Sequence, residues 1–346
     1  MTGLNNDNLA RKKRIKRKRK TTLLRIGCWN VTSFNNKDQE ILLEIKGHKL
    51  DICALSETKK KGKGNSKYGN YILIYSGKNK NERATSGVGL LLHESYENQI
   101  SNIIYVNDRI LQVTINLQKS RPTHIISIYA PDSSKTQADI DIFYQTLQTV
   151  LDGIPNHDEI IILGDFNARI GDELIPGIKN RFNAETINES GEKMIQLCIL
   201  NELRINNTFY PHKPQHKYTF ENTRGHKSTI DYIITNKNIH PTRIQDTRSL
   251  TSANAGTNHQ LVMAKMRTTI QPIKEVSKLN IESLSDESTN CLYQQRLREK
   301  IAANNIQETD DIETAWTKLR TNILQAAEEA RGRRTIKKGG RINTKS

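Results

Sequence analysis

Several apolar segments of this sequence end in, or lead directly into, a polar side chain that could bind a metal ion or a phosphate. These side chains are Asn30, Glu57, Tyr129, Asp165 with Asn167, Asp231 and His259. Hard divalent cations prefer oxygen ligands, and a histidine can move a proton near neutral pH. Because strand ends at one edge of a sandwich can converge on a single cleft, the pattern predicts one site for metal or phosphate chemistry.

The segment around Asp165 is the most specific of these signals. In Gly164-Asp165-Phe166-Asn167, a glycine, an acid and an amide follow the fully apolar run Ile160–Leu163. Asp231 is the next most informative, because it lies in an otherwise apolar run where an unpaired carboxylate would be costly. The sequence therefore predicts that Asp231 has a partner.

Each remaining signal has an ordinary structural alternative. Asn30 fits a turn former, and Glu57 precedes a lysine-rich stretch and fits a solvated loop acid. Tyr129 lies before Ala-Pro and fits a half-buried aromatic residue at a strand end. His259 taken alone fits a hydrogen-bonded structural histidine. The order of all six signals along one chain is what favours a catalytic site.

The apolar runs have the length and β-branched content of strands buried on both faces. They are Leu24–Cys28, Ile52–Leu55, Val88–Leu92, Ile125–Tyr129, Ile160–Leu163, Ile230–Ile234 and Leu261–Met266. Apolar residues recur at helical spacing from Ile140 to Leu151 and from Met194 to Cys198. Strands that alternate with helices predict one α/β domain with packed sheets, which we place at residues 22–268.

The positive charge of the chain is concentrated at its two ends. Of the net +16, residues 1–20 contribute nine Lys or Arg against Asp7, or +8, and residues 331–346 contribute +7, which leaves about +1 for the rest. Basic segments on a near-neutral body predict a polyanionic partner, held through phosphate contacts and counterion release.

The amino-terminal segment 1–21 has too little apolar content to fold alone. Its basic residues are Arg11, Lys12, Lys13, Arg14, Lys16, Arg17, Lys18, Arg19 and Lys20. A run of this density is typical of a nucleic-acid-binding arm or a nuclear-localisation signal, so we expect a nuclear protein; a solubilising disordered tail is the alternative.

Residues 269–346 differ in character from the α/β domain. Their apolar side chains at helical spacing are Ile312, Trp316, Leu319, Ile323 and Ala327. Asp310 with Glu313 resembles a capping box at the start of this helix, and residues 285–303 fit a second helix. We expect a helical appendage that ends in the second basic tail.

Other classes of protein are disfavoured. The sequence has no run of 18 apolar residues, so no membrane-spanning segment is expected. The charged amino terminus does not fit a signal peptide. The four cysteines are widely spaced with no metal-binding interval, and we interpret them as reduced thiols.

Beyond the six signals, several longer segments carry a resemblance to a known family. They are Tyr75-Ser76-Gly77, Ser86-Gly87-Val88-Gly89-Leu90-Leu91-Leu92, Asn207-Thr208-Phe209-Tyr210, His216-Lys217-Tyr218-Thr219 and Ile230-Asp231-Tyr232-Ile233-Ile234. Over residues 24–267 the chain resembles the endonuclease/exonuclease/phosphatase superfamily. It is most similar to the endonuclease domains of RTE/LINE-type retrotransposons and to craniofacial development protein 2-like proteins.

This resemblance implies a four-layer α/β sandwich, in which two packed β-sheets are flanked by helices, with the helical appendage following it. It also implies a phosphodiesterase that needs Mg²⁺, with Mn²⁺ as a substitute. The implied substrate is DNA, nicked to leave a 3′-hydroxyl, with RNA as an alternative. The chain has no Tyr/Phe-x-Asp-Asp polymerase motif, so we expect no polymerase in it.

The resemblance also implies roles for the residues that bind the metal and the phosphate. Glu57 is the principal metal ligand, and Asn30 supports the metal and the phosphate. Asn167 and Tyr129 contact the scissile phosphate. Such groups are needed because the charge of a phosphodiester repels nucleophiles and its leaving oxygen is poor.

For proton transfer, the resemblance implies that Asp165 orients or deprotonates the attacking water. His259 donates to the phosphate or transfers a proton, and Asp231 fixes the orientation of its ring. One position departs from the family, since most members have Ser-Asp-His where this chain has Thr257-Asn258-His259. Asn258 keeps an oxygen for the metal region but lacks the charge, so we expect weaker metal binding and reduced turnover.

Two other functions compete with the endonuclease. One is a phosphatase of the same fold that acts on a small phosphoester, which the basic segments disfavour. The other is a catalytically weak nucleic-acid-binding or regulatory protein, which Asn258 favours. Loss of turnover with retained DNA binding, on replacement of Glu57 or His259, separates an enzyme from a binder.

Overall fold

The computed structural model describes residues 22–117, 121–184, 186–268, 275–279, 286–307, 309–331 and 333–337. The chain divides into two compact units, Met1–Gln271 and Pro272–Ser346. The basic residues from Arg11 to Lys20, predicted to bind nucleic acid, lie outside the described residues.

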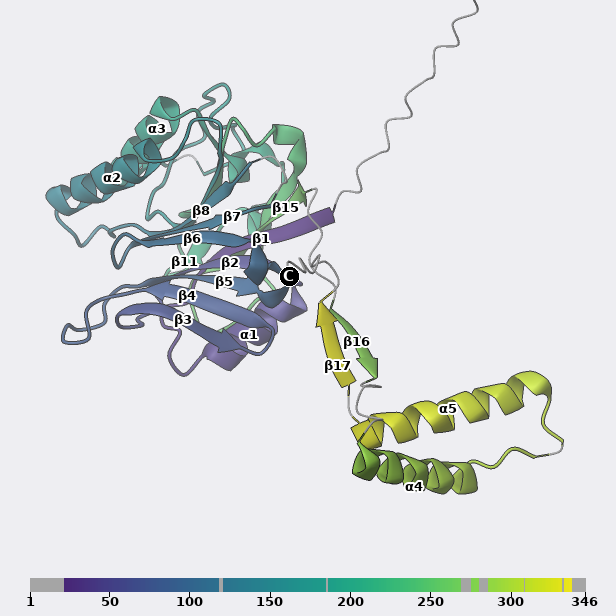
Figure 1. The fold of residues 1–346 in the computed structure, drawn as a ribbon. Coiled ribbons are helices and arrows are strands. Elements are labelled where there is room, and N and C mark those ends of the chain that lie inside the picture. The colour runs from purple at the N-terminus through teal and green to yellow at the C-terminus, as the bar shows by residue number, and fades with distance from the viewer. Residues whose placement is uncertain are drawn as a thin grey trace, which may run out of the picture. The chain divides into compact units, whose positions relative to one another are not determined.

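Two mixed β-sheets form the centre of the first unit (Figure 1). The seven-stranded sheet runs in the order β14 (Ile244–Leu250), β15 (Leu261–Thr268), β1 (Thr22–Asn30), β2 (Ile52–Ser56), β5 (Val88–His93), β4 (Tyr71–Ser76) and β3 (Lys63–Tyr68). The six-stranded sheet runs in the order β10 (Leu203–Ile205), β13 (Asp231–Asn236), β9 (Glu159–Asp165), β8 (Thr123–Tyr129), β7 (Ile110–Ile115) and β6 (Ile100–Tyr105). Only β1 with β2 and β8 with β9 pair in parallel within these two sheets.

Three apolar clusters define the layers. The first lies between the sheets and includes Ile26 and Leu163, so each sheet contributes an inner face. The second packs the six-stranded sheet against α2 (Gln137–Asp152) and α3 (Glu189–Leu200). The third packs the seven-stranded sheet against α1 (Asp38–Gly47). Helices therefore cover both outer faces (Figure 1), and the predicted four-layer α/β sandwich is confirmed.

Short elements connect these layers. They are the 3₁₀ helices η1 (Glu94–Gln99), η2 (Asn206–Phe209), η3 (Pro214–His216) and η4 (Pro241–Arg243), and the small hairpin of β11 (Phe220–Glu221) and β12 (Lys227–Ser228). All seven predicted strands are present. The strands that the sequence did not reveal include the edge strand β3, whose side chains alternate between exposed and half-buried, and whose polar composition hides it.

The second unit contains α4 (Glu287–Ala303), α5 (Ile312–Arg331) and an antiparallel pair of strands, β16 (Glu275–Leu279) and β17 (Arg333–Lys337). Both predicted helices are present. The predicted capping box is wrong, because Asp311 is the side chain that accepts from the Thr314 backbone N–H, at 2.8 Å. Asp310 instead forms an ion pair with Lys318 at 2.7 Å.

The predicted apolar face of α5 is only partly buried. Ala327 is buried, but Ile312 is 90% exposed and Trp316 is 57% exposed. The face that packs inward contains Asn322 and Ala326 instead. No helix among the described residues combines the length and apolar character needed to cross a membrane. All four cysteines are free thiols, and only Cys291 is exposed.

Candidate active site

The predicted side chains meet at one rim of the sandwich because of strand register. In the seven-stranded sheet, Asn30 at the end of β1 is opposite Ser56 at the end of β2. In the six-stranded sheet, Asp165 at the end of β9 is flanked by Tyr129 on β8 and by Asp231 on β13. The carboxyl ends of four strands and the start of β13 therefore share this rim.

Ser56 ties the two sheets together at the rim. Its hydroxyl donates to the Ile128 carbonyl at 2.8 Å and accepts from the Asp165 backbone N–H at 3.2 Å. Ser127 adds a second tie, donating to the Gly89 carbonyl at 2.9 Å. Buried hydroxyls stay hydrogen-bonded because an unpaired polar group costs free energy. These contacts fix the position of the Asp165 backbone relative to the other sheet.

The Asp165 carboxylate is the buried centre of the site. Its Oδ2 accepts from Asn30 Nδ2 at 2.9 Å, and its Oδ1 accepts from the Asn167 backbone N–H at 2.8 Å. Oδ2 also lies 3.9 Å from His259 Nε2, which is too long for a hydrogen bond. A water molecule or a phosphate oxygen could therefore be contacted by both groups.

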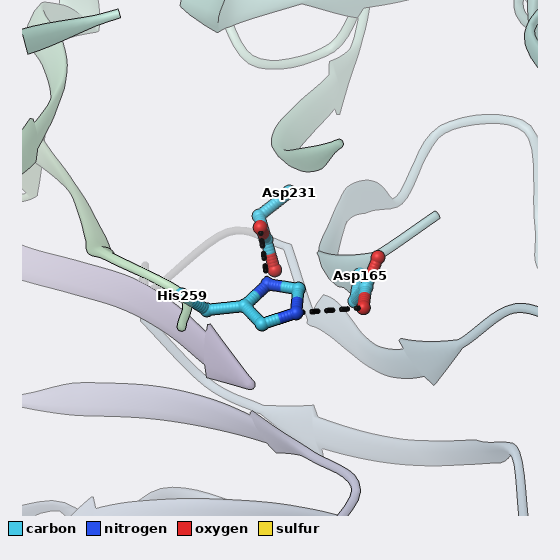
Figure 2. A group of neighbouring side chains, drawn as sticks. All are labelled: Asp165, Asp231 and His259. Carbon is cyan, nitrogen blue, oxygen red and sulfur yellow. Dashed lines mark hydrogen bonds and ion pairs between the residues drawn. The ribbon is translucent and has the colours of Figure 1, made fainter. Parts of the chain in front are cut away.

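His259 lies between two carboxylates (Figure 2). Its Nδ1 is 3.0 Å from Asp231 Oδ2, so Asp231 is paired as predicted and the imidazole presents Nε2 to Asp165. The His259 backbone is held by Trp29, whose indole N–H donates to its carbonyl at 3.0 Å, and by Thr257 Oγ1, which accepts from its N–H at 3.2 Å.

Glu57, which is half-buried, lies beside the buried Tyr129 at the site. The Tyr129 hydroxyl is 3.4 Å from Glu57 Oε2, and Lys59 Nζ is 3.0 Å from Glu57 Oε1. The Arg109 guanidinium donates to the Tyr129 carbonyl at 3.1 Å and lies 5.0 Å from the centre of its ring. The Glu57 side chain is 19% exposed, so solvent and ligands reach it.

Local backbone geometry explains why the segment around Asp165 has its sequence. Gly164 has a φ of +146°, and a Cβ there would lie 2.1 Å from the Ile128 carbonyl oxygen. Glu57 and Asn167 have φ values of 55° and 47°, in the left-handed region that L-residues seldom occupy. Strained residues of this kind cluster at functional sites, where the surrounding structure holds them in place.

Burial and mutual repulsion shift the ionisation of the central groups. Burial, followed by the charge of Asp231, raises the pKa of Asp165 to about 7. Burial alone would lower the pKa of His259, but the carboxylates of Asp231 and Asp165 outweigh it and raise that pKa to about 9. The imidazole is therefore a cation at neutral pH, and Asp165 is poised to exchange a proton.

The donor set fits a hard divalent cation. Single oxygen or nitrogen atoms of Asp165, Asp231 and His259 lie within 4.8 Å of one another. Asp231 Oδ1 is buried and has no hydrogen-bond partner among the described residues, and Glu57 adds a third carboxylate nearby. Magnesium prefers such oxygen ligands, and a cation bound here would lower the pKa of Asp165, which burial and then the charge of Asp231 raise.

The structure thus brings together five of the predicted residues through strand register and side-chain contacts: Asn30, Tyr129, Asp165, Asp231 and His259. Glu57 contacts the Tyr129 hydroxyl, and the Asn167 backbone N–H donates to Asp165. Asn258 differs from these. Its side chain is exposed, and its backbone carbonyl accepts from the Glu221 N–H at 3.0 Å. The assignment of individual roles to these residues remains a prediction.

Two hydroxyl- and amide-bearing residues at the site were not identified as site residues from the sequence. Thr219 Oγ1 accepts from the Asp231 backbone N–H at 3.1 Å. Asn207 Nδ2 donates to the Asp231 carbonyl at 3.1 Å, and its Oδ1 accepts from the Ile233 N–H at 2.9 Å. Both residues lie in segments that carry the family resemblance, and this resemblance is the signal by which the sequence could have identified them.

Aromatic packing completes the surroundings of His259. The Phe220 ring is tilted against the imidazole, with the ring centres 4.8 Å apart. This contact was also missed from the sequence, because β11 is only two residues long and its composition gives no strand signal. The ring restricts water on one side of the imidazole.

The sequence of this chain is similar to that of known proteins. Residues 123–263 match the family model described as "Endonuclease-reverse transcriptase". The chain is 30% identical to craniofacial development protein 2 of Bos taurus over 285 residues, which is 81% of this chain and 48% of that protein. The Tragulus javanicus protein of the same name is 30% identical over 73% of this chain and 44% of its own length. The chain thus spans about half the length of these relatives.

Solved structures share the fold. The AP endonuclease LMAP from Leishmania major superposes with a TM-score of 0.55 at 14% identity, covering 71% of this chain and 88% of that chain. The endonuclease domain of TRAS1, a telomere-specific non-LTR retrotransposon, gives 0.53 at 14% identity, covering 72% and 100%. The resemblance to the endonuclease/exonuclease/phosphatase superfamily is confirmed.

Proposed function

We propose that this chain is a divalent-metal-dependent phosphodiesterase that nicks DNA and leaves a 3′-hydroxyl. The observation that carries the proposal is the buried line of Asp231, His259 and Asp165, in which one imidazole is positioned by one carboxylate and faces another. The structural neighbours named above are endonucleases, including one from a retrotransposon, which supports a nuclease rather than a phosphatase.

The metal is the first requirement of the proposed reaction. Glu57, whose side chain is 19% exposed, would be the principal ligand that holds Mg²⁺, or Mn²⁺ in its place. When bound, the ion supplies charge stabilisation to the phosphate and lowers the pKa of a bound water. Asn30 orients Asp165, since its Nδ2 donates to that carboxylate.

Hydrolysis then uses the side chains already in place. As a carboxylate, Asp165 accepts a proton from the attacking water, whose oxygen bonds to phosphorus. The His259 imidazolium donates a hydrogen bond to a non-bridging phosphate oxygen, and Asp231 holds its ring. The bond from phosphorus to the 3′-oxygen breaks, and that oxygen takes a proton from solvent water, so the products are a 3′-hydroxyl and a 5′-phosphate.

The proposed test is nicking of supercoiled plasmid during a magnesium titration, followed by mapping of the new ends. We expect wild type to nick and Glu57→Ala and His259→Ala to lose about 10²- to 10⁴-fold in turnover, with DNA binding retained. His240→Ala, at an exposed histidine before η4, is the matched control. Wild type that binds DNA but nicks with neither metal would overturn the proposal in favour of a binding protein.

We propose further that the basic segment 11–20 contributes to DNA binding and directs the chain to the nucleus. The support is its charge, nine Lys or Arg among residues 1–20. Deletion of residues 11–20 is expected to weaken DNA binding and to release a fluorescent fusion into the cytoplasm. A fusion that stays nuclear after the deletion would contradict the second part.

A further inference from the structure

We propose that four lysines beside the site, Lys61, Lys63, Lys78 and Lys80, form a ledge that binds the backbone of duplex DNA on one side of the cleaved linkage. This inference rests on the proposed function and adds the direction in which the substrate extends. The four lysines are called the lysine ledge below. Lys61, Lys63 and Lys80 are exposed, and Lys78 is half-buried.

Strand register places the ledge on the same rim as the active site. Ser56, which precedes Glu57, pairs with Val88 of β5; Val88 pairs with Ser76 of β4; and Ser76 pairs with Lys63 of β3. Three strand spacings of about 4.8 Å separate β2 from β3, so Lys63 lies roughly 14 Å along the rim from the end of β2. Since phosphates of one strand are spaced by about 3.4 Å along the axis of a duplex, this is a reach of about four base pairs.

The backbone of the ledge is closely packed. Gly62 N–H donates to the Lys78 carbonyl at 2.6 Å, and Gly77 N–H donates to the Gly62 carbonyl at 2.8 Å. A Cβ on Gly77 would lie 1.8 Å from the Lys60 carbonyl oxygen, so only glycine allows this approach. The segments that carry the four lysines are therefore held against each other rather than free to move independently.

The ledge borders a groove of about 420 Å³ whose lining includes Lys63, Lys78 and Tyr105. Lys63 Nζ lies 5.8 Å from the centre of the Tyr105 ring, which belongs to the other sheet. Lys61 Nζ donates to the Lys80 carbonyl at 3.0 Å. The groove thus spans the outer strands of both sheets and presents ammonium groups along one side.

Two acids face the ledge. Asp108 accepts from Ser86 Oγ and lies 3.5 Å from Lys78 Nζ, while Glu82 Oε2 accepts from the Asn79 backbone N–H at 3.0 Å. Both carboxylates therefore have protein partners of their own. Four lysines against two occupied acids leave a positive surface, and phosphates are the ligands it suits.

The experiment compares Lys61→Gln/Lys63→Gln/Lys78→Gln with the charge-matched control Lys46→Gln/Lys49→Gln/Lys237→Gln. The control lysines are exposed, and two of them lie at the opposite ends of strands: Lys49 precedes β2 and Lys237 follows β13. A duplex with one mapped nick position is then shortened stepwise from either side, and binding and nicking are measured over a range of salt.

For the ledge variant, we expect the slope of log Kd against log salt to fall by up to about 2.7, or roughly 0.9 for each phosphate that a lysine no longer neutralises. The control should keep the wild-type slope. The difference from wild type should disappear on duplexes with fewer than about four base pairs on one side of the nick, because the ledge then has nothing to bind. Turnover of a small phosphodiester such as bis(p-nitrophenyl) phosphate should stay unchanged.

A ledge variant with the slope and flank dependence of the control overturns the inference even if the protein nicks DNA. A wild-type protein that binds DNA through the ledge without nicking overturns the proposed function and leaves the inference standing. Melting temperatures of both variants show whether either has lost its fold. If the ledge variant loses the same amount of DNA binding on duplexes of every length, that result also counts against the inference.

Discussion

Two histidine–carboxylate pairs lie at opposite ends of the six-stranded sheet. At the active-site rim, His259 Nδ1 is 3.0 Å from Asp231 Oδ2. At the other end, beside the start of β8, His124 Nε2 is 3.0 Å from Asp158 Oδ2. Both imidazoles are buried. The primary pairing is the same, so the pairing alone does not distinguish the site from a structural contact.

The difference is in the second ring nitrogen. Nδ1 of His124 is occupied by Gln112 Nε2 at 3.0 Å and Thr114 Oγ1 at 3.1 Å. Among the described residues, Nε2 of His259 has no hydrogen-bond partner, and Asp165 Oδ2 lies 3.9 Å from it. A buried imidazole with both nitrogens bonded within the protein stabilises the fold, whereas one with an open nitrogen beside a second carboxylate can serve a substrate.

The largest expected effect is a loss of turnover on replacement of Asp165, the carboxylate that faces Nε2 of His259. Asp165→Asn removes the carboxylate that faces His259 but keeps the size of the side chain, so we expect turnover to fall by at least about 10³-fold. Single-turnover nicking measures the loss. A fall of less than tenfold would mean that the open nitrogen and its facing carboxylate are not the reacting pair.

The next effect is the pH dependence of stability in the metal-free protein. The folded-state pKa values of about 9 for His259 and about 7 for Asp165 exceed their ordinary values, near 6.5 and 3.9, so the folded chain keeps protons that the unfolded chain releases. The free energy of unfolding should therefore decrease as pH rises from about 4 to 9, with His259 contributing roughly 3 kcal/mol of the decrease above pH 6.5.

Urea unfolding in chelator at pH 5, 7 and 9 measures this dependence. The variant His259→Gln should lose the share of the decrease that His259 contributes. Because the His259 charge lowers the pKa of Asp165, the share that Asp165 contributes should move to higher pH in this variant. If wild type is equally stable at pH 7 and 9, the carboxylates do not hold a proton on His259.

A smaller effect is expected at the saturated pair. His124→Gln leaves Asp158 with the exposed His157 imidazole, 3.4 Å from its Oδ1, in place of the buried one, so it should lower the free energy of unfolding by about 2 kcal/mol. Nicking per folded molecule should stay within about twofold of wild type, because the pair is at the far end of β8 and β9. A large loss of turnover without unfolding would break the distinction between the two pairs.

The smallest effect concerns Asn258, next to His259. Asn258→Asp restores the acid that most of the family carries, and the added charge should lower the magnesium concentration for half-maximal nicking by up to about tenfold. Since the Asn258 side chain is exposed, stability should hardly change. If neither the magnesium requirement nor the rate improves, the departure at this position has no catalytic consequence.

The sequence by itself predicted seven of the strands and the polar residues at their ends, whereas the buried strands β4 and β7 were missed. Buried strands such as β9 are apolar along their whole length, so the acid that ends one is visible without a structure. Asp231 was expected to have a partner because a lone buried carboxylate is costly, and His259 is that partner. Edge strand β3 and the short β11 were not visible, because neither buries a continuous apolar run.

Only the tertiary structure decided which polar groups share a site. Both pairs consist of a histidine and an aspartate: His124 with Asp158, and His259 with Asp231. Their spacing in the sequence does not show which pair belongs to the active site. Strand register places hydrogen-bonding side chains beside Nδ1 of His124, whereas it leaves Nε2 of His259 facing Asp165 across a longer distance. The same register brings Lys63 onto the active-site rim, because hydrogen bonding between strands, rather than distance along the chain, decides which side chains become neighbours.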